Sequence, residues 1–209
     1  TDDTLSVDTS GDSNADGITI TTDFGDTAET VFTDNNVSPI TGGEDGIDAK
    51  TNNAGQGVVR ITTSGVVIGD QKGILAESDE ASLYISASGR VQGTNGDGIV
   101  ASVERDDTSA SLYIEVSEVY GDNYGIDARN YASGVLQIEA TGHVEGNDDS
   151  GILANSEKET DVVIDAQTVT GKNAGISALT KGSGDIIIKA TGDVTSYGGN
   201  FSNNEGIRA

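Results

Sequence analysis

Apolar and polar residues alternate along this chain in short runs, and the runs recur in a fixed order. The clearest copy lies between Gly125 and Gly146, where Gly-Ile-Asp-Ala is followed by Leu-Gln-Ile-Glu-Ala and then by Gly-His-Val-Glu-Gly. Alternation with a period of two is typical of β-strands. No segment shows sustained apolar spacing at 3.6 residues, so we predict no helix. Each unit therefore predicts three strands of about 3–6 residues.

The unit is repeated along most of the chain. Its first run, Gly-Ile-x-Ala, has a degenerate first copy, Gly-Ile-Thr-Ile. Successive starts are separated by 29, 27, 25, 27, 26, 24 and 31 residues, and internal repeats of this length indicate a solenoid. The starts are Gly17, Gly46, Gly73, Gly98, Gly125, Gly151, Gly175 and Gly206.

The second and third runs align equally well, with an isoleucine and a valine as their respective markers. Stacked at about 4.8 Å per coil, three such columns form three parallel sheets. We predict an all-β, right-handed parallel β-helix with three strands per coil and about seven coils of 24–31 residues. The markers are Ile61, Ile85, Ile114, Ile138, Ile164 and Ile188 in the second run and Val67, Val91, Val119, Val144, Val169 and Val194 in the third.

The regularity divides the chain into two parts. Residues 1–45 are interpreted as an N-terminal cap and a degenerate first coil, and residues 46–209 as regular coils. Gly206 opens a further coil, so we expect the native chain to continue beyond Ala209 or this end to stack on another subunit. Glycines recur at the coil corners, where they are expected to supply positive φ or close backbone approach.

Composition narrows the function classes. The formal net charge is −24, from 35 acidic and 11 basic residues, which disfavours nucleic acid and anionic membranes as partners. The chain has no cysteine, so it forms neither disulfides nor thiolate metal sites. No apolar run is long enough to span a bilayer, so we expect no direct membrane insertion by this segment.

One stretch resembles the start of a calcium-binding loop. Asp12, Asn14 and Asp16 follow the pattern D-x-N-x-D-G, and Asp23 stands at the twelfth position, where glutamate is usual. Oxygen ligands at alternate positions can wrap a hard cation. The alternative is a polar turn that leads into the strand after Gly17. Ca²⁺ is therefore a candidate cofactor, and no other cofactor is indicated.

Two outward positions are candidates for binding. Tyr84 and Tyr113 occupy the same place in adjacent coils and should lie side by side, either as a platform for a sugar or partner side chain or as a pair that stabilises the sheet. Leu75 and Val100 stand at the variable position of Gly-Ile-x-Ala. They are expected to form part of an exposed apolar strip, or else to be isolated surface aliphatics.

Catalytic motifs are not evident. His143 is the only histidine and is interpreted as a surface residue beside Glu145, because no serine or cysteine constellation accompanies it. Acidic residues are abundant, but abundance does not define the carboxylate pair of a glycosidase. We predict that the protein is not an enzyme and has no catalytic residues.

The aligned columns, Gly-Ile-x-Ala, Val-x-Ile-x-Ala and Gly-x-Val-x-Gly, resemble the passenger regions of bacterial autotransporters and related haemagglutinin-type surface proteins. The resemblance covers about residues 46–209. It implies a right-handed β-helix displayed at, or released from, the bacterial outer membrane, commonly as an adhesin or biofilm factor. No C-terminal membrane barrel or export signal is present in this sequence, and the family offers no catalytic motif to carry over.

Three functions follow as expectations. The first is a non-enzymatic extracellular adhesin or stalk that mediates cell–cell or cell–surface contact, with other copies of itself or cell-surface glycans as partners. The second is a self-assembling extracellular filament subunit. The third is a carbohydrate-active β-helix enzyme, which would need acidic and basic residues clustered in a groove.

Overall fold

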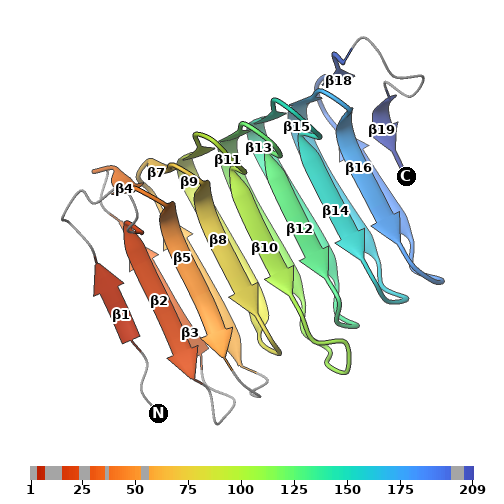
Figure 1. Cartoon of the computed structure of the whole chain (residues 1–209). Coiled ribbons are helices and arrows are strands. Elements are labelled where there is room, and N and C mark those ends of the chain that lie inside the picture. Colours follow the sequence, from red (N-terminus) through yellow and green to blue (C-terminus); the bar gives the residue numbers. More distant parts are fainter. Residues whose placement is uncertain (1–3, 8–15, 24–28, 36–37, 53–56, 199–204) are drawn as a thin grey trace.

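The protein is built from strands that wind around one axis (Figure 1). This computed structural model describes residues 4–7, 16–23, 29–35, 38–52, 57–198 and 205–209. These residues contain no helix, as the missing 3.6-residue periodicity predicts. They accordingly include no helix long and apolar enough to cross a membrane.

The Gly-Ile-x-Ala runs form one sheet of nine strands, which we call sheet A. Its first strand, β1 (Thr4–Val7), pairs antiparallel with β2, and the other pairs are parallel. The eight predicted starts lie in register, from Ile18 beside Ile47 to Ile176 beside Ile207. The parallel strands are β2 (Ile18–Asp23), β5 (Asp45–Asn52), β8 (Lys72–Ser78), β10 (Ile99–Val103), β12 (Ile126–Asn130), β14 (Ile152–Ser156), β16 (Ala174–Thr180) and β19 (Glu205–Arg208).

The second and third runs form a ten-stranded sheet, sheet B. At the two ends of the solenoid they are separate strands. In the middle coils one bent strand carries both runs, and a register shift marks the corner. The strands are β3 (Glu29–Asp34), β4 (Ile40–Gly42), β6 (Val58–Thr63), β7 (Val67–Gly69), β9 (Ser82–Gly93), β11 (Leu112–Gly121), β13 (Leu136–Gly146), β15 (Val162–Gly171), β17 (Ile186–Ala190) and β18 (Val194–Ser196).

The parallel β-helix is therefore confirmed, with one refinement of the three-strand prediction. A bulge at the second corner lets pairing continue through the bend, so two predicted strands merge in the middle coils. The predicted first coil is also in register, with Phe32 beside Ile61 and Ile40 beside Val67. The right-handed sense remains a prediction from the preference of parallel crossovers.

The interior consists of aliphatic columns. Ile47, Ile74, Ile99, Ile126 and Ile152 are fully buried one above another, and the second-run isoleucines and third-run valines form equivalent columns. At about 1.5–3 kcal/mol per buried aliphatic side chain, this stacking drives folding without large aromatic residues.

Close packing explains the corner glycines. Among the described glycines only Gly182 has a left-handed backbone, with φ of 121°. At Gly121, by contrast, a Cβ would lie 1.7 Å from the carbonyl oxygen of Tyr124. Of the two explanations offered by the sequence, close backbone approach is therefore the one that applies to the repeat.

Acidic side chains close several turns between coils. Oδ1 of Asp16 accepts the backbone N–H of Asp45 at 3.1 Å, and Oδ1 of Asp45 accepts that of Lys72 at 3.0 Å. Further along, Oδ1 of Asp97 accepts the N–H of Tyr124 at 2.9 Å. Some of the acidic side chains therefore accept hydrogen bonds from backbone N–H groups of the next coil.

We expect Ile126→Ala to destabilise the protein by about 3–4 kcal/mol, because it removes a fully buried side chain from a rigid column. Ile187→Ala is the matched control, since Ile187 is 51% exposed, and it should cost less than about 1 kcal/mol. Urea unfolding followed by circular dichroism measures both values. Equal losses in the two variants would contradict the column model of the core.

Candidate functional site

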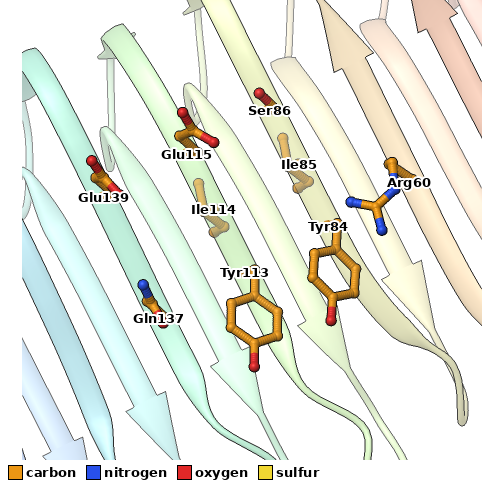
Figure 2. Close-up of a pocket in the computed structure, with 9 residues that line it drawn as sticks. All are labelled: Arg60, Tyr84, Ile85, Ser86, Tyr113, Ile114, Glu115, Gln137 and Glu139. Carbon is orange, nitrogen blue, oxygen red and sulfur yellow. The ribbon is translucent and has the colours of Figure 1, made fainter.

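The outward face of sheet B carries a ladder of side chains that stack on one another. Arg60, Tyr84, Tyr113 and Gln137 are register partners on β6, β9, β11 and β13 (Figure 2). The tyrosine rings are stacked with centroids 4.6 Å apart and planes inclined by 13°. The predicted side-by-side placement of Tyr84 and Tyr113 is confirmed, and the spacing follows from the distance between parallel strands.

A cation covers one end of this ladder. The guanidinium carbon of Arg60 lies 4.5 Å from the centroid of the Tyr84 ring, and Nε of Arg60 donates to Oε1 of Glu29 at 3.2 Å. A planar cation over an aromatic face is a favourable contact, worth about 0.5–1 kcal/mol at an exposed site. The order of the stack is thus carboxylate, guanidinium, ring and ring.

A pocket of about 190 Å³ lies along the ladder. Besides the ladder, it is lined by Ser86, Glu115 and Glu139, which stand two residues further along their strands and on the same face (Figure 2). Glu115 and Glu139 are register partners, so the two carboxylates are neighbours. Sequence reasoning noticed the tyrosines but missed these glutamates, although their spacing from Tyr113 and Gln137 was a readable signal.

A second hollow, of about 220 Å³, continues from the pocket toward the bend of sheet B. It shares Ser86 and Glu115 with the first pocket and adds the hydroxyl groups of Ser88, Ser117 and Thr141. The two hollows together offer aromatic, acidic and hydroxyl groups on one open surface. Such a surface can bind a ligand by stacking and hydrogen bonding.

The expected apolar strip on sheet A does not have the predicted exposure. Leu75 and Val100 are register partners, but Leu75 is only 6% exposed and Val100 is half-buried. On the neighbouring strands of sheet A, Asp48 and Val100 are the register partners of Leu75. They lie on either side of the leucine and cover it. The prediction of an exposed strip at Leu75 was therefore wrong.

The predicted calcium loop lies largely outside the described residues. Asp12 and Asn14 are not described, nor is the side chain of Asp23 in β2. Both oxygens of Asp16 accept protein hydrogen bonds, Oδ1 from Asp45 N–H and Oδ2 from the Thr19 hydroxyl at 3.2 Å. Within the described part of the chain, no three histidine or acidic residues are grouped to hold a metal ion. Calcium binding stays a prediction.

His143 belongs to a separate polar group on the third run. Its Nε2 lies 3.2 Å from Oε2 of Glu145, and its ring centroid lies 5.7 Å from that of Tyr120. The predicted position beside Glu145 is confirmed. The described neighbours include no nucleophile paired with this imidazole.

Sheet A contains an ion pair that sequence reasoning missed. Nε and Nη2 of Arg129 donate to Oδ1 and Oδ2 of Asp127 at 2.9 and 2.8 Å. Burial raises the pKa of Asp127 above 3.8, although Arg129 opposes the shift. Oppositely charged residues at positions i and i+2 of one strand were the sequence signal for the pair of Asp127 and Arg129.

The pKa of Tyr124 is raised as well. Burial and the nearby Asp149 raise it to about 12.

We expect acidification to stabilise the fold. Burial is the largest cause that raises the pKa values of Asp45, Asp48 and Asp127 above 3.8, so the folded protein binds protons that the unfolded chain releases. Stability must then fall as the pH rises from 3.8 through the raised pKa values. Repulsion within a chain of net charge −24 acts in the same direction.

Thermal unfolding should therefore show a higher midpoint at about pH 4.5 than at about pH 7. The variant Asp127→Asn should show a flatter dependence, because it lacks one of the groups whose pKa is raised. A lower midpoint at the more acidic pH would contradict this prediction.

Comparisons with protein-family models, curated proteins and solved structures found no match to this chain.

Proposed function

We propose that this chain is a non-enzymatic extracellular surface module, an adhesin or stalk that binds a partner through the outward face of sheet B. The observation that carries the proposal is the outward-facing, half-buried ladder of Arg60, Tyr84 and Tyr113 with its adjoining pocket. Tyrosine and arginine are, with tryptophan, enriched at the energetically important positions of protein interfaces.

The scaffold supports a role in contact rather than turnover. Strands that pair in register through successive coils hold the ladder on a rigid surface, which limits the entropy lost on binding. The hollows beside the ladder are partly open to solvent, whereas catalytic sites commonly exclude water.

The location is proposed on the resemblance of the repeat to bacterial surface passengers and on composition. An acidic chain without cysteine is compatible with display at the outer surface of a bacterium. In that setting the partner is another cell, a host surface or a second copy of the chain.

Adhesion should depend on the tyrosine ladder. Beads coated with the Tyr84→Ala/Tyr113→Ala variant should bind epithelial cells, or aggregate with one another, about tenfold less than beads with the unchanged chain. The control variant is Tyr120→Ala/Tyr197→Ala, which removes two tyrosines from outside the ladder and should bind normally.

Bound beads are counted by microscopy, and circular dichroism verifies that each variant is folded. Adhesion that is equal in both variants, or that is absent from the unchanged chain, would overturn the proposed function. Release of sugar from a polysaccharide panel would instead favour the enzymatic alternative.

A further inference from the structure

The two stacked rings of the ladder end at the far face of Tyr113. Stacked rings present their faces to one another, so one face of Tyr84 meets Arg60 and the other meets Tyr113. The far face of Tyr113 is directed toward the next rung, which holds Gln137 (Figure 2). Among the described residues, neither a cation nor a second ring contacts that face.

The occupied end of the ladder shows what such a face accepts. There the Arg60 guanidinium lies against Tyr84 and donates to a carboxylate of Glu29. The Tyr113 end also has an aromatic face with carboxylates in the same pocket, but no cation of the described residues contacts that ring. Glu115 and Glu139 line the pocket beside Tyr113, and neither makes an ion pair or hydrogen bond through its side chain with another described residue.

The next residue of this outward column, Asp165, differs from the two glutamates in having a direct ion-pair partner. Asp165 follows Glu139 in the same outward column, and the ammonium group of Lys189 pairs with Asp165. Lys189 also attracts Glu139 at longer range, but neither Glu115 nor Glu139 forms an ion pair with a described residue. Like charges on adjacent strands repel each other, so a cation placed between the two carboxylates is attracted by both and reduces their repulsion.

We propose that this pocket binds the guanidinium group of an arginine side chain from a basic partner polypeptide. The guanidinium lies beside Gln137 against the Tyr113 ring and donates to the carboxylates of Glu115 and Glu139. The inference rests on the proposed function, because it names the ligand chemistry of the same face.

Arginine fits better than lysine for a geometric reason. Its guanidinium is planar, stacks on aromatic faces and presents paired N–H groups that match a carboxylate. An ammonium group supplies only a compact charge. The net charge of −24 adds attraction at longer range, which favours encounter with a basic partner.

The test is a titration of the ¹⁵N-labelled full chain with the peptide acetyl-Gly-Arg-Gly-amide, followed by NMR. Saturable shifts centred on Tyr113, Gln137 and Glu139 are expected. The citrulline peptide has nearly the same shape without the charge and should bind at least about tenfold more weakly. The lysine peptide should bind about threefold more weakly than the arginine peptide. Absence of saturable shifts, or equal binding of all three peptides, would overturn the proposal.

Variants separate the pocket from the overall charge. Glu115→Gln combined with Glu139→Gln should weaken binding of the arginine peptide at least about tenfold. Glu104→Gln combined with Asp122→Asn removes the same charge at sites outside the pocket lining and should change binding less than about twofold. Equal losses in the two double variants would show attraction by net charge alone and would overturn the proposal. The NMR spectrum of each variant verifies its fold.

The outcome can be distinguished from that of the adhesion experiment. Loss of adhesion in the tyrosine variant without any peptide binding would overturn the arginine pocket and leave the adhesive role intact. Peptide binding at the pocket together with unchanged adhesion in the tyrosine variant would support the pocket and overturn the adhesive role.

Discussion

The structure depends on one constraint, the register of each coil on the next. Parallel backbone pairing brings equivalent residues of successive coils to a separation of about 4.8 Å. In sheet A this places Ile99 beside Ile74 and Ile126, and the side chains fill a narrow interior. A shift by one residue would turn every aliphatic outward and every polar residue inward. The alternating pattern therefore fixes the register, and the register fixes the core.

The same register acts on the outer surface, where its effect depends on the residue type. Rings gain by stacking, so Tyr84 and Tyr113 form a continuous pair that Arg60 covers at one end. Carboxylates repel at this distance, so a column of acidic residues needs cations. Lys189 supplies one to Asp165, whereas Glu115 and Glu139 have no ion-pair partner among the described residues. Stacking in register therefore places two carboxylates without an ion-pair partner side by side in a pocket of sheet B.

The acidic composition has several physical roles. Some carboxylates replace backbone partners at the turns, as Asp45 and Asp97 do for Lys72 and Tyr124. Others are partly buried beside basic residues, as in the pair of Asp127 and Arg129. A sequence-level charge count groups these residues with the solvated ones, although their protonation and their contribution to stability differ.

The sequence by itself determined the repeat, the absence of helix among the described residues, the inward columns and the adjacency of Tyr84 and Tyr113, because each follows from periodicity along the chain. Tertiary structure decided what periodicity does not encode. It merged two predicted strands through a bulged corner and covered Leu75 with its register partners on sheet A. It also showed that Gly121 is required because the backbone approaches closely there. It also placed Glu115 and Glu139 in one pocket with Tyr113. These features depend on distances between coils, and such distances exist only once the coils are stacked.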